Sequence, residues 1–198
     1  MSMNSLSTAR GNPYITMIWL AIGGSFLLFL FLVLVFVMRT HAPDWKPIPL
    51  PLALSFSTLV ILFSSVSLHF SVQSFQAESY RNWFFWTSIT LGLGLAFGLL
   101  QMAGCKFILD SGHGIGETSV AFMVLFSGLH FLHILMGLGG IFWVWLDSFA
   151  GRSYVDGFIS SLNPKVTTRI RVVSVFWHFL DGIWILLYSL LWWQSLRA

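Results

Sequence analysis

The chain has 198 residues, of which 57% are hydrophobic and only 9% are charged. Soluble domains carry about 25% charged residues, so this composition excludes an ordinary soluble protein and indicates an integral membrane protein. The formal net charge is +3. A positive charge is expected of a membrane protein, because its cytoplasmic loops are rich in lysine and arginine. No nucleic-acid-binding motif accompanies the charge, so we expect no nucleic-acid partner.

Five apolar runs of membrane-spanning length follow one another along the chain, since a transmembrane helix needs about 20 mostly apolar residues. The runs cover approximately residues 15–38, 50–72, 83–102, 120–146 and 172–193. The first run exceeds the roughly 7–15 apolar residues of a signal peptide, so we expect a retained helix. Behind a polar N-terminal tail over residues 1–14, the sequence therefore predicts an all-α fold, a polytopic membrane bundle of five transmembrane helices within residues 15–198.

The first two predicted helices carry no carboxylate. In helix 15–38, the cluster Gly23-Gly24-Ser25 allows another helix backbone to approach closely. A proline-rich loop follows, which predicts an extended connection. Helix 50–72 is unusually rich in serine and threonine, whose hydroxyls can bond back to the helix's own carbonyls or reach a neighbouring helix.

The third predicted helix, residues 83–102, combines glycines with an amide near its end. Gly94 and Gly98 lie four residues apart and predict a smooth stripe for close helix packing. Gln101 lies where the helix is expected to leave the bilayer. The glycine-rich segment at residues 112–116 lies between membrane helices rather than in an α/β unit, so it predicts a flexible turn and not a phosphate loop.

Ionisable side chains gather in the middle of the last two predicted helices. His130 and His133 are three residues apart and therefore share a helix face. The helix over residues 172–193 carries His178 and Asp181, which also lie one turn apart. A charge at the bilayer centre costs about 2.5–3.5 kcal/mol, so such residues are expected to have partners. Interhelix hydrogen bonding, proton relay, and metal or heme ligation all fit these residue types.

The lysines and arginines predict the orientation. The N-terminal side of the five spans would carry six of them and the opposite side four. By the positive-inside rule this places the N-terminus in the cytoplasm and the C-terminus outside. Most of the excess comes from the stretch 147–171, which we expect to be a long loop.

Two segments resemble the signature segments of subunit III in the heme-copper terminal oxidase (cytochrome c oxidase) family. These are FSGLHFLHILMG at residues 126–137 and FWHFLDGIWILLYSLLWW at residues 176–193. The segment at residues 53–68 and Gln101 are also similar to the family, and the match runs in order along nearly the whole chain. Its length fits the short form of subunit III, with five helices. By resemblance, His130, His133, Trp177, His178 and Asp181 match family motif positions and are expected to form an interhelix polar cluster.

The resemblance implies a subunit without catalytic residues and without a metal or redox cofactor of its own. Such a subunit packs against the catalytic subunit I, which holds heme and copper, beside subunit II and in some cases within a larger respiratory supercomplex. It binds phospholipid and helps sustain proton uptake during oxygen reduction in the bacterial cell membrane. Two positions depart from the family: Gly24 and Ser25 stand near a usual carboxylate of the first helix, and Gly104 replaces an acid.

Two other functions stay open at this point. Histidines on facing helices can ligate heme, so the pattern also fits a free-standing heme b membrane protein. Within the resembling family, a subunit III-like component of a nitric oxide reductase is a further alternative. The electron donor, cytochrome c or quinol, is left open as well, because donor sites lie on other subunits of the resembling complexes.

Overall fold

The computed structural model describes residues 13–110, 116–150, 155, 157–158 and 162–197. Five long helices account for most of this described part: α1 (Pro13–Arg39), α2 (Leu52–Gln76), α3 (Tyr80–Asp110), α4 (Thr118–Ala150) and α6 (Pro164–Ser195). All five are long and apolar enough to cross a membrane. The prediction of an all-α bundle with five transmembrane helices is therefore confirmed.

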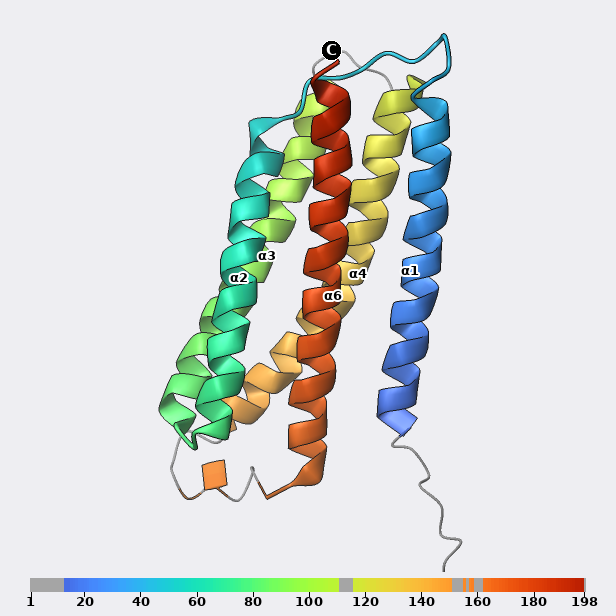
Figure 1. The fold of residues 1–198 in the computed structure, drawn as a ribbon. Helices are drawn as coiled ribbons and strands as arrows, with labels where there is room; N and C mark the ends of the chain where they lie inside the picture. The colour runs from blue at the N-terminus through green and yellow to red at the C-terminus, as the bar shows by residue number, and fades with distance from the viewer. Residues whose placement is uncertain (1–12, 111–115, 151–154, 156, 159–161, 198) are drawn as a thin grey trace, which may run out of the picture.

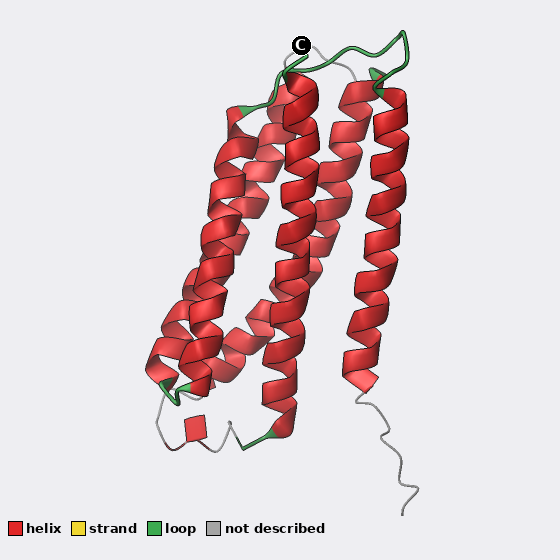
Figure 2. Ribbon diagram, viewed as in Figure 1, coloured by secondary structure: helices red, strands yellow, loops and turns green. Residues whose placement is uncertain are grey.

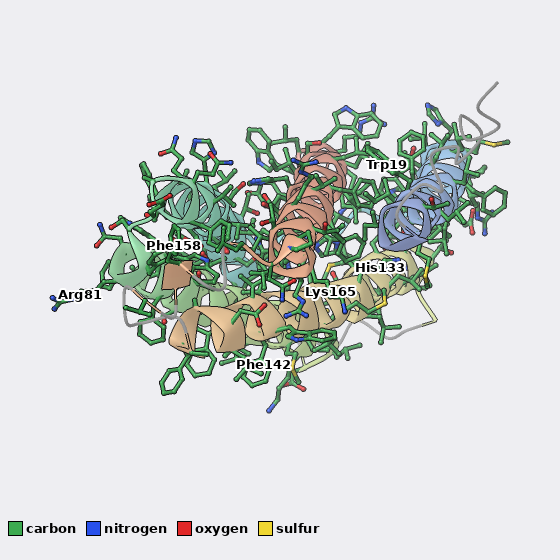
Figure 3. The ribbon with its side chains drawn as sticks, turned by 90° about the horizontal axis from the view of Figure 1, so that it is seen from below. Trp19, Arg81, His133, Phe142, Phe158 and Lys165 are labelled. Atoms are coloured by element: carbon green, nitrogen blue, oxygen red, sulfur yellow. The ribbon has the colours of Figure 1, made fainter. Side chains whose placement is uncertain are left out.

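The helices run alternately up and down, so the start of α1 and the C-terminus lie at opposite ends of the bundle (Figure 1). α2 and α6 form one layer, α3 and α4 lie behind them, and α1 stands beside α4 and α6 (Figures 1 and 3). Turns and extended segments join the helices at the two ends (Figure 2). The polar side chains discussed below are thus held on rigid helices within the membrane.

Two helices are longer than the apolar pattern predicts. α3 continues to Asp110 instead of ending near residue 102, and α6 begins at Pro164 instead of residue 172. At about 1.5 Å per residue, helices of this length exceed the roughly 30 Å hydrocarbon core, so their charged ends reach the headgroup layer. The segment between the predicted spans 83–102 and 120–146 and the predicted loop at 147–171 are therefore partly helical, whereas residues 1–12 and 112–115 lie outside the described residues.

The junction between α2 and α3 is lined by hydroxyl groups. Ser71 Oγ lies 2.6 Å from Thr87 Oγ1, and Ser67 Oγ lies 2.8 Å from Thr90 Oγ1. Thr87 and Thr90 also donate to carbonyls one turn back in α3. The hydroxyls predicted in the second helix thus serve both of their expected purposes, bonding within a helix and bonding between helices.

We expect the Ser67–Thr90 bond to contribute a modest, measurable coupling. In a double-mutant cycle of Ser67→Ala and Thr90→Val, measured as thermal or denaturant stability in detergent micelles, the coupling should be about 0.6 kcal/mol, the average for interhelix bonds in membranes. Ser189→Ala is the matched control, since the Ser189 hydroxyl donates only to Leu186 O of its own helix. The effects of Ser189→Ala and Thr90→Val should therefore be additive. Equal coupling in both cycles would contradict the hydrogen bond between Ser67 and Thr90.

A tryptophan wedge fixes the centre of the bundle. The indole of Trp177 on α6 is fully buried and packs against glycines of two other helices. A Cβ at Gly94 would lie 2.8 Å from Trp177 Cη2, and a Cβ at Gly137 would lie 3.0 Å from Trp177 Cε3. The predicted glycine stripe on the third helix therefore makes room for this ring.

The lower ends of α4 and α6 are joined by an ion pair between Arg169 and Asp147. The same guanidinium lies over the ring of Trp143, 4.1 Å from its centroid. Lys165 and Arg169 were expected in a loop, but both lie within α6. The long charged side chains can reach the headgroup layer while their stems pack on apolar surface.

Candidate functional site

His178 and Asp181 lie together near the middle of α6. His178 is 14 residues from Pro164 and 17 from Ser195, so it lies close to the middle of the helix. His178 Nδ1 lies 2.7 Å from Ser65 Oγ of α2 and 3.7 Å from Asp181 Oδ2. The side chain of His178 is 40% exposed, whereas that of Asp181 is only 5% exposed.

The carboxylate of Asp181 is incompletely paired. The 3.7 Å separation from His178 is too long for a hydrogen bond, and neither oxygen of Asp181 has a hydrogen-bond partner within the described part of the chain. Ser65 is therefore the direct partner of the imidazole, and Asp181 lies beside it. A buried polar group without a partner is costly, which makes this the most demanding place in the bundle.

His133 on α4 has a complete set of partners. Its Nδ1 lies 2.7 Å from Leu129 O, and its Nε2 lies 3.0 Å from Ser25 Oγ of α1. Because a carbonyl can only accept, Nδ1 carries the proton, and in the neutral ring Nε2 accepts from the Ser25 hydroxyl. Ser25 thus links α1 to α4 through this hydrogen bond.

His130 lies in an aromatic environment. The ring is fully buried, stacks on Trp184 at 5.2 Å between centroids, and meets the edge of Phe97 at 5.8 Å. Neither ring nitrogen has a hydrogen-bond partner among the described residues. His130 and His133 both contact the ring of Phe29 on α1, which agrees with the shared helix face expected from their spacing.

Gln101 of α3 and Trp177 of α6 both lie buried in the core of the bundle. Gln101 Nε2 donates to Ser57 Oγ of α2 at 3.2 Å, and the residue is 2% exposed. The Nε1 of Trp177 has no partner among the described residues, so its visible role is packing against glycines. At Gly104 an added Cβ would lie 2.9 Å from Leu54 Cδ2, so the short residue admits α2.

The structure therefore distributes the predicted residues over separate environments. His178 and Asp181 come together, as do His130 and His133, but in the described residues no hydrogen bond or ring contact joins one pair to the other. The partners that the motifs did not predict are hydroxyls from α1 and α2. They are Ser25, Ser55, Ser57, Thr58 and Ser65, which bond to His133, Tyr188, Gln101, Trp184 and His178 respectively.

This arrangement is suited to holding helices together. Within the described residues, no three His, Cys, Asp or Glu side chains are placed to hold a metal ion. The spanning helices α1 and α2 contain no carboxylate that could extend a path from Asp181, and a proton path across a bilayer needs a chain of such groups. What the described contacts supply is hydrogen bonds between helices.

Comparison with known proteins gives a consistent result. No protein-family model matches the chain. The cytochrome bo(3) ubiquinol oxidase subunit 3 of Buchnera aphidicola is 27% identical over 132 residues, which cover 67% of this chain and 64% of that protein. Probable quinol oxidase subunits 3 of Staphylococcus haemolyticus and Staphylococcus aureus are 27% identical over 179 residues, 86% of this chain and 84% of theirs.

The similarity is accompanied by the expected five-helix fold. The staphylococcal match extends over most of both chains, whereas the Buchnera match spans less than two thirds of that protein. Five membrane-spanning helices, histidines on α4 and a histidine with an acid on α6 are all present in order. The chain is therefore similar to subunit 3 of heme-copper quinol oxidases over most of its length.

Proposed function

We propose that the chain is an accessory subunit III of a bacterial respiratory terminal oxidase. In this proposal it packs on a catalytic subunit I that holds heme and copper, beside a subunit II, and supports oxygen reduction without performing it. The observation that carries the proposal is the match to subunit 3 proteins over 86% of the chain. Phospholipid binding and support of proton uptake are part of the same proposal.

The candidate site residues have a structural role in this proposal. His133 and Gln101 connect helices by direct hydrogen bonds, and His178 connects α6 to α2. Trp177 fixes the distance between α6 and the glycines of α3 and α4. His130 and Asp181 complete the set as buried groups that the surrounding helices hold in place. These contacts support a bundle-fixing role, with catalysis in a neighbouring chain.

The electron donor we propose is a quinol. The relatives are named as subunits of ubiquinol or quinol oxidases, and this supports a quinol over cytochrome c for the complex that holds this chain. The donor would bind on another subunit. Oxygen uptake by the purified complex with a soluble quinol, compared with reduced cytochrome c, distinguishes the two.

We also propose the orientation predicted from the charges. Arg81 and Lys165 lie at the lower end of the bundle, as the view from below shows (Figure 3), together with the start of α1 (Figure 1). Arg169 and Arg171 are near the same end of α6. By the positive-inside rule this end faces the cytoplasm, and the C-terminus lies outside.

A spectroscopic experiment tests the accessory role against the heme b alternative. Expressed alone and purified, the chain should show no Soret band, because the ring of His130 is enclosed by Trp184 and Phe97. His130→Ala and His178→Ala should leave the spectrum unchanged. A stoichiometric heme signal that disappears in either variant would contradict the accessory role and establish heme ligation instead.

A further inference from the structure

A pocket lies at the end of the bundle that holds the C-terminus. It forms where residues of the loop between α1 and α2 meet the start of α4, which lies beside the end of α1 (Figure 1). Its volume is about 280 Å³. We call it the α4 pocket, and its lining residues are Asp44, Lys46, Gly116, Glu117, Thr118 and Ser119. All of them except the glycine have a polar or charged side chain.

The start of α4 favours an anionic group in this pocket. The amide of Ala121 donates to Glu117 O, so the amides of residues 118–120 lie in the first turn, where backbone donors lack an intrahelical partner. The helix dipole adds a partial positive charge at the same place. Backbone donors and the dipole together make the N-terminus of a long helix suitable for binding an anion.

Ser119 is the residue that points to a ligand. It is only 3% exposed and it lines the α4 pocket, yet its hydroxyl has no hydrogen-bond partner among the described residues. Buried polar groups in native structures are nearly always hydrogen-bonded, because an unsatisfied one costs free energy. A ligand oxygen in the pocket would supply the acceptor that this hydroxyl lacks.

The loop between α1 and α2 brings charged side chains to the pocket on a fixed support. The ring of Trp45 packs on Phe36 of α1 and on Phe122 of α4, with 5.5 Å and 6.4 Å between the ring centroids. Asp44 and Lys46 are the neighbours of this tryptophan in the sequence and both line the pocket. The two charges are therefore placed beside the start of α4 before any ligand binds.

The charges of the α4 pocket fit a group that carries both signs. Lys46 forms no ion pair with any other described residue, so its ammonium is available to a phosphate. Asp44 lies 3.5 Å from Arg39, but this pair is exposed on both sides, and a carboxylate accepts from several donors at once. A bare phosphate would lie beside the carboxylates of Asp44 and Glu117, whereas a phosphate with an attached ammonium satisfies both signs.

We propose that the α4 pocket binds the headgroup of a phospholipid that carries a primary ammonium group. Lys46, the Ser119 hydroxyl and the first-turn amides hold the phosphate, and the ammonium donates to the carboxylates of Asp44 and Glu117. The source is a lipid because the pocket lies at the ends of the spanning helices α1 and α4, at the level of the headgroups. The inference rests on the proposed function for lipid binding, and it adds the site and the headgroup.

Native mass spectrometry of the full chain, delipidated in detergent and mixed with one short-chain lipid at a time, tests the headgroup. Phosphatidylethanolamine should bind at least about threefold more tightly than phosphatidylcholine or phosphatidylglycerol. Choline has no N–H donor for the carboxylates, and the glycerol headgroup has no cation. Asp44→Asn should remove the preference for phosphatidylethanolamine over phosphatidylcholine. Free phosphoethanolamine, which has no lipid tails, should bind much more weakly than the lipid.

Three further variants test the location. Lys46→Gln and Ser119→Ala should each weaken binding of phosphatidylethanolamine about tenfold. Lys106→Gln removes the same charge from an exposed position near the end of α3, outside the α4 pocket, and should leave the affinity within about twofold. Because the Ser119 hydroxyl has no partner in the chain, Ser119→Ala should leave the melting temperature of the lipid-free chain within about 2 °C.

The outcomes that overturn the proposal are distinct from those that overturn the proposed function. Equal affinity for the three lipids, tightest binding of phosphatidylglycerol, or equal loss in Lys46→Gln and Lys106→Gln would each overturn the α4 pocket as this headgroup site. Equally tight binding of free phosphoethanolamine would overturn the lipid as its ligand. The expected lipid preference in a chain that is isolated from its native membranes without any oxidase subunit would keep the pocket and overturn the proposed function.

Discussion

Gly94→Leu should lower the melting temperature of the bundle. A Cβ at this position would lie 2.8 Å from both Trp177 Cη2 and Leu138 Cδ2, closer than carbon atoms pack. The leucine end could shift, but the rigid indole cannot retreat, because Gly137 of α4 holds its other edge. Overpacking of this kind costs typically about 1–3 kcal/mol. We expect the upper end of this range, measured as a melting temperature lowered by roughly 6–12 °C.

Gly92→Leu is the control for this effect. Gly92 lies on the same helix, and an added Cβ there meets nothing within 4 Å. Both substitutions raise helix propensity to the same extent. The difference in melting temperature between the two variants therefore reports the contact with Trp177. The melting temperatures are measured by fluorescence of the purified chain. Equal values for the two variants would show that Trp177 does not form the wedge.

Asp181→Leu should reduce assembly of the complex severalfold, whereas Asp181→Asn should leave both assembly and turnover within about twofold. The asparagine keeps the shape of the side chain and its capacity for hydrogen bonds. Leucine removes the polar group that lies 3.7 Å from His178 Nδ1, so the imidazole loses a neighbour that helps to hold its position. Recovery of the other subunits and oxygen uptake per assembled complex are the two measurements.

The pair of readouts separates a structural role from proton transfer. An acid that only holds the imidazole can be replaced by an amide, since the contact to His178 remains possible. An acid that carries protons cannot be replaced in this way. Full assembly of Asp181→Asn with loss of oxygen uptake would therefore contradict the structural role and support a proton path through α6.

Much of the fold can be predicted from the sequence because lipid imposes a simple requirement. A spanning segment must satisfy its backbone internally and be apolar over about 20 residues, so five apolar runs predict five helices. The ends of α3 and α6 could not be predicted in the same way. Lys106 and Arg169 look like loop residues in an apolar pattern, yet both lie within helices that continue into the headgroup layer.

The candidate site shows a different limit. Spacing alone predicts that His178 and Asp181 meet, because residues three apart share a helix face. The partner of His178, Ser65, is 113 residues away in sequence, and several hydroxyls of α2 could equally have taken its place. Which of these hydroxyls bonds to His178 depends on the rotation and depth of α2 against α6. The packing between the two helices sets both, and this packing leaves no local signal in the sequence.

The most direct test of the account is to isolate the tagged chain from its native membranes in mild detergent and identify the proteins and heme that accompany it. We predict recovery with a large heme-containing subunit in equal amount, and no heme on the chain when it is expressed alone. Recovery of the chain by itself, or of heme that stays with the chain after its partners are removed, would contradict its assignment as an accessory subunit of a terminal oxidase.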